Sequence, residues 1–384
     1  MAERGTEVKK NKKSQVILVK GTYFDYPLFF LVIFLVGFGL LMVYSSSFYE
    51  GRIKYGNSSF FFTRQLVFAG AGFIAMMIIS VIRYQFLQKL VHIGLIVGAA
   101  FMILLRVKGI SKNGSTRWLE VFGIRFQPSE FVKIILIIYV AYLFTKYSGM
   151  LRKFTDELKI LIVPGIFVVL IAIENLSSAI ICFSIIAVMW FVATPKPLKV
   201  IILGAIGMAG LVGSIFLVGY RSDRIDAWLH PETAKNGFQV MQSLYAIGNG
   251  GIFGRGLGGS IQKMGSVPEA YNDMIFSIIC EELGIVGAAA IIIVFIMLLW
   301  RIRFIAESAP DRFGSFICVG VIAHIGVQVL VNIGVVTNTI PNTGVTLPFI
   351  SYGGTSLMLL LAEMGVIFSI TRQIRPYRPK VGEQ

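Results

Sequence analysis

Asp273 is the residue of this chain best placed for acid–base chemistry. It ends the stretch SVPEAYND, which is polar like a loop, and precedes MIFSIICEELG, which is apolar like a membrane helix. A carboxylate at the boundary between water and lipid can accept a proton from a hydroxyl held beside it. A helix N-terminus also favours a charged carboxylate, so an N-cap role is the alternative. The sequence therefore predicts either a general base or a helix cap at residue 273.

Two pairs of charged residues lie inside apolar runs. Glu130 and Lys133 are three residues apart, so on a helix they share one face and can pair. Glu281 and Glu282 follow Asp273 by more than two turns, which on a straight helix places them roughly 12 Å deeper. Ionisable groups inside a bilayer are costly and usually face the interior of a bundle. We expect the first pair to support a site and the adjacent glutamates to tether helices, with Lys133 as a candidate partner.

A polar stripe and a glycine-rich stretch are two further candidates. His324, Gln328 and Asn332 recur every four residues, so they form either interhelical hydrogen bonds or the wall of a site. The stretch AIGNGGIFGRGLGGS (246–260) could bring backbone N–H groups close to an anion, with Lys263 as an added cation. It lacks the Lys-Ser/Thr ending of a P-loop, so a flexible loop is an equal alternative.

The elements that must position these residues are membrane helices. The chain has 384 residues, of which 56% are hydrophobic and 14% charged, whereas about a quarter of a soluble domain is charged. Runs of about 17–25 apolar residues predict an all-α polytopic membrane protein with about ten transmembrane helices. The runs are 27–48, 66–82, 88–105, 129–146, 157–173, 177–194, 197–219, 274–300, 313–336 and 354–371.

The charged loops and tails predict the orientation. We expect a basic tail at 1–26, a transmembrane domain at 27–372 and a second tail at 373–384. Lys and Arg in both tails and in the short loops on their side indicate that this side is cytoplasmic. Two larger loops, at about 106–128 and 220–272, would then be extracellular, the second between the seventh and eighth spans.

These two extracellular loops are basic, against the usual topology rule. Either an anionic ligand is held there or long loops tolerate charge. The net charge of +15 suits anionic headgroups, and without a nucleic-acid motif it does not indicate nucleic acid. Cys182, Cys280 and Cys318 have no metal-binding spacing and are expected as buried hydrophobes. The loop cations are Arg106, Lys108, Lys112, Arg117, Arg125, Arg221, Arg224, Lys235, Arg255 and Lys263.

Four long motifs stand out in the chain: NGSTRWLEVFGIRFQPSEFVK, GFQVMQSLYAIGNGGIFGRGLGGSIQK, VPEAYNDMIFSIICEELG and PNTGVTLPFISYGGTS. They resemble signatures of the SEDS family (shape, elongation, division and sporulation; FtsW, RodA and SpoVE). The resemblance covers nearly the whole chain, including the expected spans. The features GLLMVYSSS (39–47) and VPEA look more like the division and sporulation branch than the elongation branch.

The resemblance implies a peptidoglycan glycosyltransferase. Such an enzyme would polymerise lipid II, a polyprenyl-pyrophosphate-linked disaccharide-peptide, at the outer face of the bacterial cytoplasmic membrane. It would work in cell division or related wall synthesis, beside a class B penicillin-binding protein that cross-links the strands. A divalent cation, Mg or Mn, is compatible with this chemistry, but the sequence does not require one.

The same resemblance carries site residues over to this chain. Asp273 matches the essential aspartate of a Pro-Glu-x-x-x-Asp motif, and Glu130 and Lys133 match a charged pair. The other matched residues are Arg117, Lys263, Ser351, Gly353, Gly354 and Ser356. Many members have an aspartate in the turn where this chain has Asn175, so we assign that turn no site.

The expected reaction is an inverting displacement at an anomeric carbon. Asp273 would take the proton of the acceptor hydroxyl, and Arg117, Lys133, Arg224 and Lys263 would stabilise the departing pyrophosphate. The main alternative is a lipid II flippase, which also suits buried charges but needs a polar path across the membrane. A scaffold that only recruits the penicillin-binding protein would require neither Asp273 nor the basic loops.

Overall fold

The computed structural model describes residues 23–112, 115–121, 123–149, 154–195, 197–213, 219–234 and 237–374. The expected tails at 1–26 and 373–384 therefore lie outside the described residues, except for 23–26 and 373–374. Lys235 and the side chains of Lys112 and Arg221 also lie outside them.

Ten helices lie where the ten apolar runs predict them. Within the described ranges, eight of them are long and apolar enough to cross a membrane. The other two are α5, which has Asp156 and Glu157 in its first turn, and α7, which has 17 residues. The fold class is confirmed, and crossings beyond eight stay a prediction. The helices are α1 (Tyr26–Tyr55), α2 (Phe60–Val81), α3 (Leu87–Lys108), α4 (Pro128–Lys146), α5 (Phe154–Glu174), α6 (Leu176–Ala193), α7 (Pro197–Gly213), α10 (Ile275–Ser308), α11 (Arg312–Val336) and α12 (Gly354–Thr371).

The two large loops contain structure of their own. The second holds α8 (Gly219–Leu229) and α9 (Phe238–Gly250), and a short 3-10 helix, η1 (Tyr84–Phe86), precedes α3. The first loop forms an antiparallel sheet in the order β1-β2-β3, which the all-α expectation did not include. Its last turn uses Gly123 at φ +77°, a conformation that favours glycine. The strands are β1 (Ile110–Lys112), β2 (Ser115–Val121) and β3 (Ile124–Phe126).

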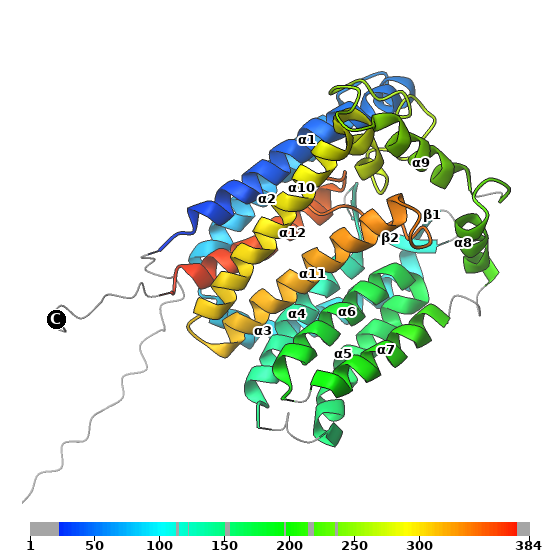
Figure 1. Cartoon of the computed structure of the whole chain (residues 1–384). Helices are drawn as coiled ribbons and strands as arrows, with labels where there is room; N and C mark the ends of the chain where they lie inside the picture. Colours follow the sequence, from blue (N-terminus) through cyan, green and yellow to red (C-terminus); the bar gives the residue numbers. More distant parts are fainter. Residues whose placement is uncertain are drawn as a thin grey trace, which may run out of the picture.

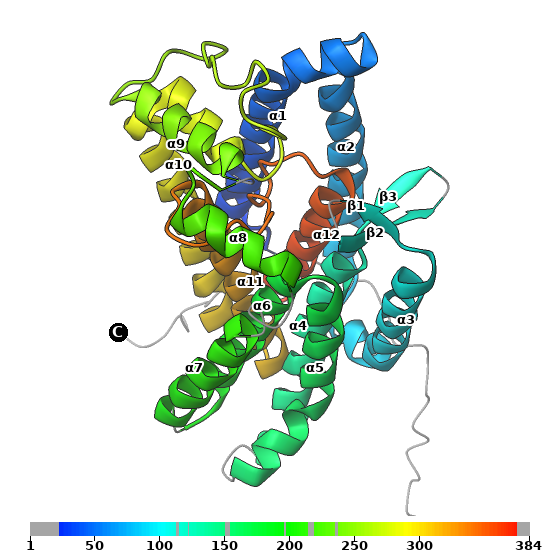
Figure 2. The ribbon, with the colours of Figure 1, turned by 90° about the vertical axis from the view of Figure 1, so that its right-hand side faces the viewer.

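The helices run side by side, and α8, α9 and the sheet gather at one end of the bundle (Figures 1 and 2). We call this the loop end. Helix α1 begins and α12 ends at the opposite end (Figure 1), as an even number of crossings requires. Glycines let α2 and α12 approach closely. A Cβ atom at Gly72 of α2 would lie 2.6 Å from the Leu361 side chain of α12. A Cβ atom at Gly365 of α12 would lie 2.8 Å from the Met76 carbonyl oxygen of α2.

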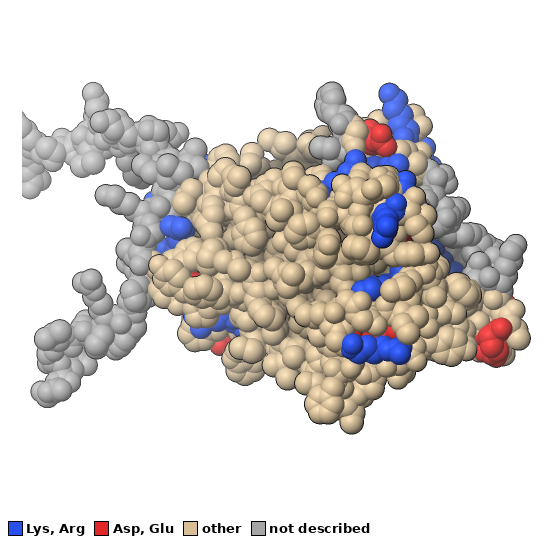
Figure 3. Space-filling model, turned by 90° about the horizontal axis from the view of Figure 1, so that it is seen from above, with Lys and Arg blue, Asp and Glu red and all other residues tan. Residues whose placement is uncertain are grey.

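Ion pairs join neighbouring helices at the end of the bundle opposite the loop end. Asp25 accepts a hydrogen bond from the Leu28 N–H at the start of α1 and pairs with Arg301 of α10 at 2.9 Å. The fully buried Glu157 of α5 accepts from Trp190 of α6 and pairs with Lys199 of α7 at 2.5 Å. Lys and Arg side chains are grouped toward the two ends of the face seen in Figure 3, with a broad surface of other residues between them, as expected of a membrane-spanning bundle.

Helix α10 is broken at Gly284, where φ is +67° and ψ is −170°. The glycine-rich stretch fills the break. The N–H groups of Arg255 and Gly256 donate to the Glu281 and Glu282 carbonyls at 3.0 and 2.9 Å, and those of Ile285 and Val286 donate to Gly251 and Ile252 at 3.0 and 3.2 Å. The stretch therefore caps both helix ends at the break.

The glycines of this stretch are needed for backbone-to-backbone contact. A Cβ at Gly250 would lie 1.9 Å from the Cys280 oxygen, and one at Gly254 would lie 2.2 Å from the Glu282 oxygen. In the described structure the stretch therefore bonds to the protein's own backbone at the break in α10, and a role in holding an anion stays a prediction.

Candidate active site at the loop end

Asp273 lies just before α10, at the loop end. Met274 occupies the N-cap position and no side chain caps this helix, so the alternative N-cap role for Asp273 is wrong. The Asn332 side chain of α11 donates to the Asp273 carbonyl at 2.8 Å and to the Val345 carbonyl at 2.7 Å. One buried amide thus ties the backbone of Asp273 to the loop between α11 and α12.

That loop brings Gly344 between Asp273 and Arg117. A Cβ at Gly344 would lie 3.4 Å from Nη1 of Arg117 and 3.8 Å from Oδ2 of Asp273. Gly344 has φ +70°, a backbone conformation that also favours glycine. A side chain at this position would therefore contact both the guanidinium and the carboxylate.

Helix α8 closes the site from another side. Arg224 donates to the Asn342 carbonyl at 3.1 Å, and Trp228 donates to the Asn338 carbonyl at 3.0 Å. Asn342 in turn donates to Gln239 of α9 at 3.1 Å. Arg224 is thereby held beside the loop that carries Gly344.

Burial has the largest effect on the pKa of the Asp273 carboxyl. The residue is 8% exposed, and its Oδ1 has no hydrogen-bond partner among the described residues. Burial and, second, the nearby charge of Glu269 raise the pKa of Asp273 to about 7, although Arg224 and Arg117 act to lower it. A carboxyl with a pKa near neutrality is suited to exchanging a proton at physiological pH.

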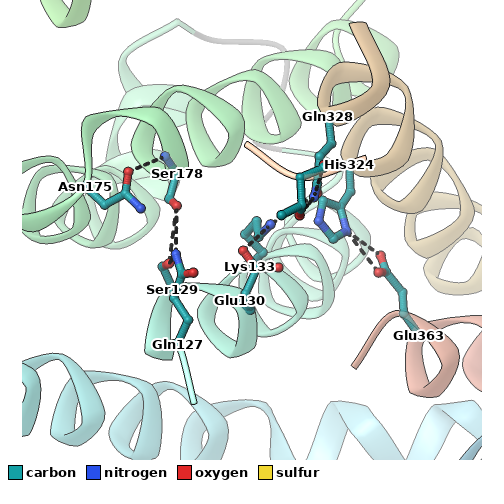
Figure 4. A network of polar contacts seen from close by, with 10 residues as sticks. Gln127, Ser129, Glu130, Lys133, Asn175, Ser178, His324, Gln328 and Glu363 are labelled. Carbon is teal, nitrogen blue, oxygen red and sulfur yellow. Dashed lines mark hydrogen bonds and ion pairs between the residues drawn. The ribbon is translucent and has the colours of Figure 1, made fainter. Parts of the chain in front are cut away.

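Glu130 and Lys133 pair as their spacing predicts, at 2.8 Å (Figure 4). Lys133 is buried and also donates to Gln328 at 3.3 Å. Gln328 donates in turn to the Thr346 carbonyl at 3.1 Å, two residues from Gly344. The pair is therefore connected through Gln328 to the loop that carries Gly344.

The other residues of the polar stripe also form hydrogen bonds within the protein. His324 Nδ1 lies 2.9 Å from the Glu363 carboxylate of α12 (Figure 4). His324 and Gln328 thus bond to side chains of other helices, the first of the two alternatives. Asn332 instead bonds to the backbone of Asp273 and Val345, beside the site. Asn175, where many SEDS members have aspartate, accepts from the Ser178 N–H at 3.2 Å and caps α6.

Lys263 lies against Glu282, not at Asp273. Its ammonium pairs with Glu282 at 2.7 Å and donates to Ser45 of α1 at 2.9 Å. Glu281 accepts from Ser260, and from the Ile261 N–H at 3.1 Å. The glutamates do tether segments, but among the described contacts their cation partners are Lys263 and Arg255, so Lys133 as partner was wrong.

The expected depth of the glutamates, roughly 12 Å below Asp273, stays a prediction. Gly284 follows both glutamates, so the break in α10 does not alter the helical segment that joins them to Asp273. Ser45 of α1 also donates to Glu282, at 2.6 Å.

The four residues matched near α12 shape the start of that helix. Ser351 accepts from the Leu347 N–H at 2.8 Å, and the Gly353 N–H donates to Gln65 of α2 at 3.2 Å. A Cβ at Gly354 would lie 2.2 Å from the Phe68 ring. Ser356 lies beside Gly353. These contacts join α12 to α2, and a role in substrate binding stays a prediction.

Asp273, Arg117 and Arg224 are thus brought together, with Glu130 and Lys133 in support and Lys263 apart. Sequence reasoning missed Gly344, although PNTG is a typical turn motif, and it missed the direct bond from Asn332 to the Asp273 backbone. The described residues contain no group of three or more His, Cys, Asp or Glu that could hold a metal ion.

The fold and this site define a multi-pass membrane protein with a buried carboxyl group near two arginines at one end of the bundle. The family model described as a cell cycle protein, FtsW/RodA/SpoVE, matches residues 26–376. The chain therefore belongs to the FtsW/RodA/SpoVE family, as the sequence motifs predicted.

Two relatives come from Bacillus subtilis (strain 168). Stage V sporulation protein E is 40% identical over 364 residues, covering 93% of this chain and 99% of the relative. A probable peptidoglycan glycosyltransferase FtsW is 36% identical over 374 residues, covering 92% and 91%. These similarities agree with the predicted division and sporulation branch.

Solved structures share the fold. A chain from work on the structural coordination of polymerization and crosslinking by a peptidoglycan synthase complex has a TM-score of 0.75 at 24% identity, covering 91% of this chain and 98% of that one. The rod shape determining protein RodA of Thermus thermophilus has a TM-score of 0.68 at 24% identity, covering 92% and 98%.

Proposed function

We propose that this protein is a peptidoglycan glycosyltransferase that polymerises lipid II into glycan strands. The observation that carries the proposal is the buried Asp273 carboxyl, with a pKa near 7, beside Arg117 and Arg224. Relatives that match nearly the whole chain are named as probable peptidoglycan glycosyltransferases.

In this mechanism Asp273 is the general base. The acceptor sugar hydroxyl attacks the anomeric carbon of the donor, and its proton passes to the Asp273 carboxylate. A bond forms between the acceptor oxygen and the anomeric carbon while the bond from that carbon to the pyrophosphate oxygen breaks. One attack opposite an axial leaving group inverts the anomeric centre, so one carboxylate base suffices.

The departing pyrophosphate requires positive charge nearby. Arg117 and Arg224 lie close enough to act electrostatically on Asp273, so we assign them this role. Lys133 and Lys263 already pair with Glu130 and Glu282, and we assign them to support of the site. The described residues offer no group of three or more His, Cys, Asp or Glu to hold a Mg or Mn ion, and no step of this mechanism is assigned to one.

The proposed setting is the bacterial cytoplasmic membrane, with the loop end on the outer side. The basic first and last segments of the chain favour that orientation. We also propose that a class B penicillin-binding protein is the partner, since a chain of a peptidoglycan synthase complex shares the fold.

A lipid II flippase is the second candidate, and the buried polar stripe is the observation in its favour. Its groups, however, bond to Lys133, to Glu363 and to loop backbone, which is the pattern of a closed bundle. The gathering of Asp273 and the two arginines at one end favours the enzyme over a transporter or a scaffold.

The test is polymerisation of fluorescent lipid II by the purified protein, with and without its penicillin-binding partner. We expect Asp273→Asn to lower the rate by at least about 10²-fold, the usual contribution of a general base. Asp226→Asn is the matched control, because Asp226 is exposed on α8. Near-normal strands from Asp273→Asn would refute the assignment of the base, and transport without polymerisation by the unmodified protein would favour the flippase.

A further inference from the structure

The glycine-rich stretch has an apolar surface that the proposed reaction does not use. Five large hydrophobic side chains between residues 251 and 264 are 52–82% exposed, and Phe253 is the most exposed of them. The other four are Ile252, Leu257, Ile261 and Met264. So much exposed apolar surface in a short loop requires either a partner or lipid.

The length of α10 gives the depth of this surface. Arg301, which binds Asp25 and the Tyr23 hydroxyl, marks the membrane boundary at the end opposite the loops, since charged groups lie at the interface. Ile285 lies about 24 Å further along the helix at 1.5 Å per residue. The hydrocarbon core is about 30 Å thick, so Ile285 lies inside it, and any tilt of the helix only increases its depth.

The loop is bonded directly to that depth. The carbonyls of Gly251 and Ile252 accept from the N–H groups of Ile285 and Val286. Ile285 and Val286 are themselves exposed apolar residues, 64% and 54%. The apolar surface of the loop therefore continues the lipid-facing surface of α10.

The backbone pairing in this stretch suits a dry environment. Non-helical backbone in the hydrocarbon region is tolerated only where its polar groups are satisfied. The N–H groups of Gly254, Arg255 and Gly256 donate to the carbonyls of Gly250, Glu281 and Glu282. Arg255, whose guanidinium lies 3.7 Å from Glu281, can extend its charge toward the boundary.

We propose that residues 251–264 form a re-entrant segment that dips into the leaflet at the loop end. Its apolar side chains contact lipid acyl chains rather than water or another protein. The inference is independent of the reaction catalysed.

Site-directed nitroxide labelling tests the proposal in the full-length protein, reconstituted in phosphatidylcholine–phosphatidylglycerol liposomes. The variants are Phe253→Cys and Leu257→Cys in the segment, Ile293→Cys on the exposed face of α10, and Thr233→Cys in the exposed turn after α8. The three native cysteines are buried, so the unmodified protein measures background labelling. Collision rates are compared for oxygen, which concentrates in lipid, and for a water-soluble nickel chelate.

We expect labels at 253 and 257 to collide more often with oxygen than with nickel, as the label at 293 does, and the label at 233 to show the opposite order. Labels at 253 and 257 that behave like the label at 233 would overturn the proposal. Low collision rates with both reagents would also overturn it, because a protein surface, such as a second copy of the chain, would then cover the segment.

Discussion

The charge state of Asp273 depends on a few neighbours that act in opposite directions. Burial and Glu269 favour the neutral carboxyl, whereas Arg224 and Arg117 favour the carboxylate. Because a general base works only when deprotonated, the polymerisation rate should rise as the pH rises through about 7 and level off above it.

Two substitutions should move this pH profile in opposite directions. Glu269→Gln removes a negative charge, so the pKa of Asp273 falls and the rate should rise at lower pH than in the unmodified protein. Arg117→Ala removes a positive charge, so the pKa rises and the rise should occur at higher pH. The pH dependence of kcat/KM measures both, and shifts in the same direction would show that neither charge acts through Asp273.

A substitution of Glu282, the partner of Lys263, can show whether Lys263 stabilises the fold or binds the substrate pyrophosphate. Lys263→Met leaves Glu282 buried without its ammonium, and breaking such a pair costs about 3–5 kcal/mol. We expect a lower unfolding temperature in detergent. The double variant with Glu282→Gln should recover most of that loss, and no recovery would mean that the pair is not what Lys263 stabilises.

Residue types at the site were predictable because acids and bases inside apolar runs stand out. Their pairing was only partly predictable. Glu130 and Lys133 share one helix, so their spacing determines the contact. Lys263 and Glu282 are 19 positions apart and meet because the chain turns back between them, before α10 begins, and no local spacing encodes that. Gly344 was missed because its function depends on two side chains from distant segments.

Among the elements, the broken α10 helix links the site to the membrane. Its first piece begins beside Asp273 and ends at Glu281 and Glu282, where the glycine-rich stretch holds it. The capping contacts depend on glycines that admit another backbone, so the break should be sensitive to the smallest added side chain.

Two glycines of α9 offer a matched comparison. Gly250→Ala would place a methyl group 1.9 Å from the Cys280 oxygen, whereas Gly248 has nothing within 4 Å. We expect Gly250→Ala to destabilise the protein by about 1–3 kcal/mol, the usual cost of overpacking. Gly248→Ala should be neutral or slightly stabilising, because alanine favours a helix. Thermal unfolding in detergent compares them, and equal unfolding temperatures would contradict the close contact.

The apolar helices were predictable because length and hydropathy suffice for them. The sheet between α3 and α4 was not, since its strands are only three to seven residues long. The break in α10 was hidden because Gly284 lies in a continuous apolar run and its need for capping appears only once the loop is in place.

At the scale of the whole molecule, the orientation of the bundle determines where chemistry can occur. The loop end should face outward if both tails are cytoplasmic. Ten apolar runs predicted a bundle with both ends of the chain on one side, and α1 and α12 agree with it (Figure 1).

Cysteine labelling in intact cells tests the orientation. Thr233→Cys lies at the loop end and Gly149→Cys at the opposite end, and both positions are exposed. A membrane-impermeant maleimide should modify the first variant in intact cells and the second only after permeabilisation. The reverse order would place the active site in the cytoplasm and exclude the proposed substrate side.

The pair between Asp25 and Arg301 has a consequence for biosynthesis. The two residues are 276 positions apart in the chain, so a ribosome that has released the first helix must complete nearly three hundred further residues before its buried aspartate meets a cation. Until then α1 carries an uncompensated charge at its start. A nascent chain arrested before α10 should therefore be a preferred substrate for membrane quality-control proteases. The first helix to enter the membrane would be among the last to form its native ion pair.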